Sequence, residues 1–256
     1  MHTAPSPSSP IRAVLFDLDG TLRETQPTPR QVFRQVLEAW HIRLPDAAWR
    51  ALWRWEHAFW AESPALQALE ARYRTPEGRD IGFWYAYQAL KLQRLGFGPA
   101  QAAAMAPQLV EVMSRHFEQA EDRLRPAAQW VLRALRAQGL RVGVLTNRRV
   151  PLPEDYLRAL GLEGLLDDVW VAAELGVWKP HAEAFWYPLR QWGLEPHQVV
   201  YVGDNYFADV RGARQAGLHA VLIDPDDVFP EVPEPRVRCL DELLEVLAQW
   251  NGRGSV

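Results

Sequence analysis

Cysteine and lysine are both scarce in this chain of 256 residues. The single cysteine, Cys239, excludes an internal disulfide, so a reducing compartment such as the cytoplasm is the simplest location. It has no visible partner in the sequence, and we expect a small buried residue there rather than a nucleophile. Among the 28 basic residues, only Lys91 and Lys179 are lysines.

Long apolar runs and an excess of charge of one sign are also missing. No stretch approaches the roughly 18–20 apolar residues of a membrane helix, and the net charge of −4 comes from intermixed acidic and basic residues. We therefore expect neither a membrane nor a nucleic acid as a partner. Residues 1–10 are rich in proline and serine and carry no lysine or arginine, which predicts a disordered tail rather than a signal peptide.

What the chain does contain is an alternation of strands and helices. Apolar runs rich in strand formers recur at 11–17, 140–146, 169–172, 199–203 and 219–224. Helical patterns lie between or after them at about 126–138, 153–160, 182–192, 208–216 and 242–250. Continuous apolar runs are typical of strands buried on both faces. The predicted fold class is α/β, with a Rossmann-like parallel sheet as core and helices on both of its faces.

Residues 23–125 interrupt this alternation. They show no clear strand and at least four helical patterns, at about 29–41, 46–62, 80–95 and 99–121. We interpret this stretch as an all-helical domain inserted after the first strand. The α/β core would then comprise residues 11–22 and 126–250.

Polar residues gather where the predicted strands end, and ligands bind beyond the carboxyl ends of strands in open parallel sheets. These residues are Asp17, Asp19, Thr146, Asn147, Lys179, Asp204, Asn205 and Asp209. Carboxylates a few ångströms apart repel one another unless positive charge offsets them. Oxygen ligands without histidine or cysteine favour Mg²⁺, and an anionic substrate would complete the charge balance.

The spacing of Asp17 and Asp19 suggests a division of labour. Alternate residues of an extended segment point to the same side, so both carboxylates face one site while Leu18 points into the core. Gly20 permits a sharp turn that lets the backbone carbonyl of residue 19 face the metal as well. One carboxylate would stay ionised and attack, and the other would donate and accept a proton.

Four segments resemble, in order and spacing, the four motifs of the haloacid dehalogenase-like (HAD) hydrolase superfamily: FDLDGTL (16–22), LTN (145–147), KP (179–180) and VGDNYFAD (202–209). The resemblance covers about residues 11–224, and the helical insert resembles the C1 cap of the phosphatases. It implies that Asp17 is a nucleophile forming an aspartyl-phosphate, and that Asp19 is the acid and then the base. Mg²⁺ would be held by Asp17, the backbone carbonyl of Asp19, and Asp204.

The resemblance also implies roles for the remaining residues. Thr146 would hydrogen-bond the phosphoryl group, and Lys179 would stabilise its developing charge. Asp209 would orient Lys179 or a metal-bound water, and Asn147 and Asn205 would line the rim, Asn147 against the substrate. The predicted activity is Mg²⁺-dependent hydrolysis of a small phosphorylated metabolite.

Structural explanations compete for some of these residues. Thr146 with Asn147 could cap a loop, and Asp209 could cap the helix that follows. For Lys179 the composition favours function, because a chain with two lysines places one where a compact ammonium is useful.

The insert also offers candidates for substrate recognition. Its aromatic residues at helical spacing could stack on a base or sugar, although such a stripe is more often helix packing. They are Trp49, Trp53, Trp55, Trp60, Trp84, Tyr85 and Tyr87. Arg23, Arg54 and Arg148 could bind a second anionic group, although most arginines of this chain must be solvated surface.

Other functions compete with the phosphatase. A phosphomutase of the same superfamily also carries both aspartates, and no motif in the insert favours it. A dehalogenase is disfavoured, because the dehalogenase relatives lack the second aspartate that Asp19 supplies. A non-catalytic binding or scaffold protein would have no physical reason to keep four mutually repelling charges.

Overall fold

The computed structural model describes residues 10–61, 63–76 and 78–252, so the predicted tail lies outside the described residues apart from Pro10. The chain divides into two compact units. The first, called here the sheet unit, runs up to Glu24 and resumes at Asp122, and the second, the helical unit, is Thr25–Glu121. Among the described residues, none of the helices is both long and apolar enough to cross a membrane.

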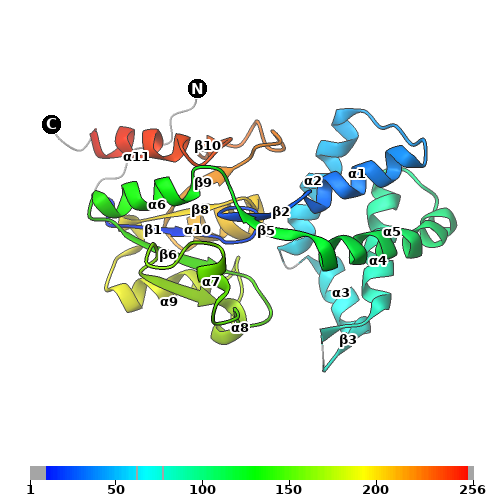
Figure 1. Cartoon of the computed structure of the whole chain (residues 1–256), viewed down its shortest axis with the longest axis horizontal. Helices are drawn as coiled ribbons and strands as arrows, with labels where there is room; N and C mark the ends of the chain where they lie inside the picture. Colours follow the sequence, from blue (N-terminus) through cyan, green and yellow to red (C-terminus); the bar gives the residue numbers. More distant parts are fainter. Residues whose placement is uncertain (1–9, 62, 77, 253–256) are drawn as a thin grey trace. The chain divides into compact units, whose positions relative to one another are not determined.

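The sheet unit is built on a six-stranded sheet in the order β10-β9-β8-β1-β6-β7 (Figure 1). Its strands are β1 (Ala13–Phe16), β6 (Arg141–Thr146), β7 (Asp168–Val171), β8 (Val199–Gly203), β9 (His219–Ile223) and β10 (Arg236–Val237). All five pairs of neighbours are parallel. In the centre, Val14 lies opposite Val142 on one side and Val200 on the other. The predicted α/β class is confirmed.

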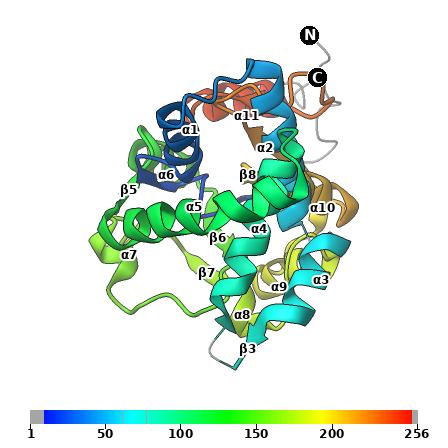
Figure 2. The same ribbon diagram turned by 90° about the vertical axis from the view of Figure 1, so that its right-hand side faces the viewer.

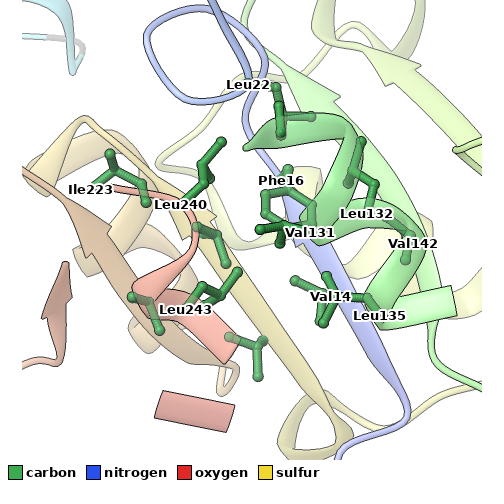
Figure 3. Packing of buried hydrophobic residues seen from close by; sticks show 14 of the residues in the cluster. Val14, Phe16, Leu22, Val131, Leu132, Leu135, Val142, Ile223, Leu240 and Leu243 are labelled. Carbon is green, nitrogen blue, oxygen red and sulfur yellow. The ribbon is translucent and has the colours of Figure 1, made fainter. Parts of the chain in front are cut away.

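Helices cover both faces of this sheet. Figures 1 and 2 place α6 (Ala128–Ala137) and α11 (Glu242–Gly252) on one face and α9 (Ala182–Trp192) on the other. On the first face, Val14 and Phe16 of β1 pack among Val131, Leu135 and Leu243 of the two helices (Figure 3). Strand alternation puts the neighbours of these β1 residues on the opposite face.

Close packing on that opposite face depends on a glycine. A Cβ at Gly143 would lie 2.8 Å from the indole of Trp192, so only glycine lets α9 approach β6 this closely. Phe185 of the same helix packs edge-to-face on Tyr201 of β8, with ring centroids 5.0 Å apart. Tyr201 is thereby fixed with its hydroxyl at the site described below.

The helical unit contains α1 (Pro29–Ala39), α2 (Asp46–Trp60), α3 (Pro64–Tyr73), α4 (Ile81–Arg94) and α5 (Pro99–Gln119) (Figure 2). Caps explain several of the starts: Thr28 forms a capping box with Gln31, and Asp80 accepts bonds from two backbone N–H groups of α4. The sequence patterns missed α3. Ser63 caps it, but Leu66 is its one buried residue, so no apolar stripe marks it.

The expectation that residues 23–125 contain no strand is wrong. Two short pairs form there, one of β2 (Arg23–Gln26) with β5 (Glu121–Leu124) and one of β3 (Arg74–Thr75) with β4 (Gly78–Arg79). These segments are two to four residues long and mostly polar, so they lack the apolar pattern that marks a buried strand. The β2–β5 pair lies at the two points where the chain passes between the units.

Two helical predictions in the sheet unit are corrected in part. Of the pattern at 153–160, only α7 (Tyr156–Ala159) is helical, since a turn at residues 154 and 155 follows Pro153 and delays the start of the helix. The pattern at 208–216 becomes a π-helical turn, Tyr206–Arg211, followed by α10 (Gly212–Gln215). Such turns are rare and occur frequently at functional sites.

Cys239 is exposed, which contradicts the expectation of a buried thiol. The buried positions of this segment are taken by Val237 and Leu240, and the two residues between them, Arg238 and Cys239, are exposed. A hydrogen bond with Asp241, with lesser contributions from partial loss of hydration and from the nearby Glu242, raises the pKa of the Cys239 thiol to about 11. A thiol that stays protonated is a poor nucleophile.

The aromatic residues of the helical unit pack mainly against one another. Trp49 stacks on Trp53 with centroids 5.5 Å apart, and Trp60 lies edge-on to Tyr87 at 5.1 Å. Tyr85, by contrast, is exposed. Most of the predicted aromatic stripe therefore has a packing role within the unit.

A charged cluster lies within this aromatic packing. Lys91 Nζ lies 3.1 Å from Glu56 and 3.9 Å from the centroid of the Phe33 ring. Burial opposes the charge of Glu56, but Lys91, Arg30 and a hydrogen bond from Tyr87 outweigh it and lower the pKa of Glu56 to about 2. Lys91, one of the two lysines of the chain, thus compensates the charge of a buried carboxylate.

Candidate active site

Asp17 and Lys179 form a buried ion pair at the carboxyl edge of the sheet. Asp17 follows β1 directly, and its Oδ1 accepts a hydrogen bond of 2.6 Å from Lys179 Nζ. The ammonium also donates to Tyr201 Oη and Asp209 Oδ1, both at 2.7 Å. Three donors thus meet three acceptors. Burial opposes the charge of Lys179, but Asp17 and Asp209 outweigh it and raise the pKa of the lysine above its usual range.

The loop that carries Lys179 is held by Asn147. The Asn147 side chain accepts from the backbone N–H of Lys179 and donates to its carbonyl, both at 2.8 Å. Both polar groups of this amide are thereby used on the backbone of the lysine. The structure thus places Asn147 against the Lys179 backbone, and its contact with substrate stays a prediction.

Asp209 is held in place by the π-helical turn. Its Oδ2 accepts from the backbone N–H of Asn205 at 2.9 Å, while its Oδ1 accepts from Lys179. Asn205 caps the turn by accepting from Phe207 and Ala208. A Cβ at Gly203 would lie 2.4 Å from Asp209 Oδ2, so the carboxylate occupies the space that any other residue would fill.

The carboxylates of this site suit a divalent cation. Oxygen atoms of Asp17, Asp204 and Asp209 lie within 4.8 Å of one another. With all three ionised, one ammonium leaves two negative charges unbalanced. Burial, opposed by Lys179 and reinforced by the neighbouring carboxylates, raises the pKa of Asp17 well above its ordinary value. Both oxygens of Asp209 accept hydrogen bonds, from Lys179 and from the backbone of Asn205, and the hard oxygen set of the three carboxylates fits Mg²⁺.

Gly20 shapes this part of the site. Its φ of +91° favours glycine, and an added Cβ would lie 2.5 Å from Asp204 Oδ2. We therefore expect Gly20→Ala to displace the Asp204 carboxylate and to weaken Mg²⁺ binding at least about tenfold, an effect typical of disturbing a metal site. Titration of the rise in melting temperature with Mg²⁺ measures this loss.

Gly139→Ala is the matched control for that substitution. Gly139 has a φ of +77°, but nothing lies within 4 Å of its added Cβ. This variant should lose stability through backbone strain and keep its Mg²⁺ response. Equal Mg²⁺ responses in the two variants would contradict the placement of Asp204 at the metal.

Asp19 is contacted by two arginines. Arg148 donates to both of its oxygens at 2.7 Å, and Arg23 Nε donates to Oδ1 at 2.5 Å. Thr146 Oγ1 lies 3.4 Å from Oδ2. Burial alone would raise the pKa of Asp19, but the two guanidinium groups outweigh it and lower that pKa. Asp19 retains 35% of its side-chain exposure, so it is accessible at the site.

The sheet unit therefore brings together the residues that the sequence places at strand ends. Lys179 contacts both Asp17 and Asp209, and Thr146 lies beside Asp19. A carboxylate oxygen of Asp204 lies near those of Asp17 and Asp209. Arg54 lies on α2 of the helical unit. The patterns missed Tyr201 and Thr21, whose hydroxyl lies 3.4 Å from Asp204 Oδ1, and they missed Tyr156 and Asp122. Tyr201 lies within a buried strand and Thr21 within a motif that the sequence did show. No signal in the sequence singled out Tyr156 or Asp122.

A carboxylate beside a buried ammonium, with a second carboxyl group two residues further along, is equipped for nucleophilic displacement. At the carboxyl edge of a parallel sheet, this arrangement is typical of an α/β enzyme that works through a carboxylate nucleophile. Residues 11–217 match the haloacid dehalogenase-like hydrolase family, and the chain belongs to that family.

Curated relatives match nearly the whole chain. A phosphoserine phosphatase from Thermus thermophilus is 34% identical over 250 residues, 91% of this chain and 98% of the relative. A glyceraldehyde 3-phosphate phosphatase from Methanopyrus kandleri is 28% identical, with 93% and 98% covered. A ribulose-1,5-bisphosphate 5-phosphatase from Halopiger xanaduensis is 30% identical, with 84% and 85% covered.

Solved structures show the same fold. A 2-haloacid dehalogenase from Pseudomonas syringae is 27% identical, with a TM-score of 0.51 and coverage of 94% of this chain and 99% of that one. A HAD-family hydrolase from Bacillus subtilis is 22% identical, with a TM-score of 0.56 and coverage of 93% and 99%.

Proposed function

We propose that this protein is a Mg²⁺-dependent phosphatase that hydrolyses a small phosphomonoester through a phosphorylated Asp17. The observation that carries the proposal is the pairing of the buried Asp17–Lys179 contact with a carboxyl group at Asp19. A leaving alkoxide needs a proton, whereas a halide does not. Asp19 therefore favours cleavage of a phosphoester over displacement of halide from carbon.

The first step transfers the phosphoryl group. An oxygen of Asp17 bonds to phosphorus while the bond from phosphorus to the leaving oxygen breaks, and the protonated form of Asp19 gives its proton to that oxygen. Because the two arginines lower the pKa of Asp19, this carboxyl group must take up its proton against them before the step. Lys179 balances the charge on the phosphoryl oxygens, and Thr146 donates a hydrogen bond to one of them. A divalent ion held by Asp17, Asp204 and the backbone carbonyl of Asp19 would supply a further positive charge for the phosphate.

The second step restores the enzyme. Water bonds to phosphorus as the Asp17–phosphorus bond breaks, and Asp19 takes the proton that water loses. Inorganic phosphate leaves, Asp17 is ionised again, and Asp19 again carries the proton needed for the next cycle. Asp209 and Asn147 act indirectly, because each holds Lys179.

The substrate is proposed to be a small phosphorylated metabolite, which agrees with the names of the relatives. Residues 25–121 would act as the cap that selects it. The proposal includes a cytoplasmic location, because an exposed unpaired thiol such as Cys239 suits a reducing compartment.

The test is phosphate release from 4-nitrophenyl phosphate and from a panel containing phosphoserine, glyceraldehyde 3-phosphate and ribulose 1,5-bisphosphate. We expect release with Mg²⁺ and a fall of at least about 100-fold with excess chelator, as expected when charge stabilisation is removed. Isomerised substrate without free phosphate would indicate a mutase instead. No turnover, together with no Mg²⁺-dependent stabilisation, would contradict the proposal and favour a scaffold.

A further inference from the structure

A closed ring of hydrogen bonds surrounds one side of Asp19. Starting from Asp19, Arg23 bridges to Asp122, its Nη1 donating to Asp122 Oδ1 at 2.8 Å. Tyr156 donates to the other oxygen of Asp122 at 2.5 Å and accepts from Arg148 Nη2 at 2.6 Å. Arg148 closes the ring with two bonds to Asp19.

The ring balances its own charges. Arg23 and Arg148 carry two positive charges, Asp19 and Asp122 carry two negative charges in their ionised forms, and Tyr156 is a neutral phenol that both donates and accepts. Each guanidinium contacts the Asp19 carboxylate and one further group, which is Asp122 for Arg23 and Tyr156 for Arg148. The two arginines are therefore engaged within the protein, which argues against their serving as an open site for a second anionic group of the substrate.

The ring draws on four separate parts of the sheet unit. Arg23 begins β2, Asp122 lies in β5, Arg148 follows β6 by two residues, and Tyr156 begins α7. Arg23 and Asp122 are 99 residues apart in sequence, and Arg148 and Asp19 are 129 apart. A guanidinium on a flexible side chain has many rotamers, so an acceptor behind it fixes the direction in which its N–H groups point.

We propose that Tyr156 and Asp122 are positioning residues that fix Arg148 and Arg23, and through them the direction of the Asp19 carboxyl group. Asp122 bonds to Arg23 and Tyr156 bonds to Arg148, so both residues act on Asp19 through an arginine. This inference rests on the proposed function, because Asp19 needs a fixed direction only if it delivers a proton to the leaving oxygen. Proton delivery requires the donor oxygen to lie within hydrogen-bond reach of the leaving oxygen, about 2.6–3.2 Å between heavy atoms.

The role predicts a dependence on the leaving group. An alkoxide departs poorly without a proton, whereas 4-nitrophenolate departs as a stable anion. Tyr156→Phe removes only the hydroxyl that joins Arg148 to Asp122. We expect this change to lower kcat/KM about 10- to 100-fold for an alkyl phosphate such as phosphoserine, which is part of the roughly 10²–10⁴-fold that a positioned acid contributes. For 4-nitrophenyl phosphate we expect kcat/KM to fall less than about threefold.

The measurement compares kcat/KM for 4-nitrophenyl phosphate with that for phosphoserine or glyceraldehyde 3-phosphate, whichever the wild type hydrolyses faster. The ratio kcat/KM reports steps up to departure of the leaving group, so it leaves out the later reaction with water, which is common to all substrates. Asp122→Asn is the second variant, because it keeps the shape and removes one charge; it should show the same selective loss. Tyr187→Phe, at an exposed tyrosine of α9, is the matched control and should change neither value.

The outcomes separate the two proposals. Equal losses for both esters in Tyr156→Phe and Asp122→Asn would show a merely structural role and overturn the positioning role. Unchanged kcat/KM for both esters would overturn it as well. Failure of the wild type to hydrolyse any of these esters would instead contradict the proposed function.

Discussion

Replacing Asp17 with asparagine is expected to reduce Mg²⁺-dependent phosphate release by about 10⁴-fold or more, the range found when a catalytic nucleophile is removed. The amide has the shape of the carboxyl group but cannot attack phosphorus as an anion. The fold should persist, because the substitution removes one charge from a group of carboxylates and leaves Asp209 to balance Lys179. The measurement is the rate of phosphate release at saturating substrate.

Two controls accompany this variant. The melting temperature of Asp17→Asn should equal or exceed that of the wild type, which separates loss of chemistry from loss of structure. Asp241→Asn makes the same chemical change at an exposed position of the sheet unit and should keep full activity. Turnover by Asp17→Asn within about tenfold of wild type would mean that another group attacks phosphorus.

Replacing Lys179 with methionine should affect both rate and stability. Methionine has nearly the same length but carries no charge, so Asp17 and Asp209 are left buried without their ammonium. Removing one partner of a buried pair typically costs about 3–5 kcal/mol. Loss of a group that stabilises transition-state charge typically lowers kcat about 10²- to 10³-fold. Urea unfolding in metal-free buffer and steady-state kinetics measure the two effects.

Tyr201→Phe is the matched control for Lys179. It removes one of the three acceptors around Nζ, and also the bond from Tyr201 to the carbonyl of Leu145, without changing any charge. We expect a loss of about 1–3 kcal/mol and less than about a tenfold change in kcat. A Lys179→Met variant no worse than Tyr201→Phe would contradict the central place of the ammonium.

The sheet could be predicted from the sequence because its strands are buried on both faces and read as apolar runs. The run at 199–203 matches β8 in full, and the helix expected at 182–192 matches α9. The polar residues could be predicted to converge because parallel strands end at one edge of a sheet. Asp17, Lys179 and Asp209, separated by 162 and 30 residues from one to the next, are in hydrogen-bond contact there.

What could not be predicted depends on contacts without a local pattern. Neither Tyr156 nor Asp122 stands out in the sequence, and their ring with Arg148 and Arg23 exists only because segments far apart in the chain meet. The β2–β5 pair has no apolar alternation, and α3 buries too few residues to show a stripe. The sequence predicted that Asn147 lies at the site, but it did not predict that its side chain bonds to the backbone of Lys179.

The central claim, that Asp17 is phosphorylated during turnover, is tested most directly by trapping the phosphorylated enzyme. The enzyme is mixed with the best substrate of the panel, carrying a radiolabelled phosphoryl group, quenched in acid, and reduced with borohydride so that mass spectrometry locates the modified residue. The proposal predicts label on the wild type that hydroxylamine removes, reduction at Asp17, and no label on Asp17→Asn. Label on another residue, or phosphate release by Asp17→Asn at the wild-type rate, would contradict it.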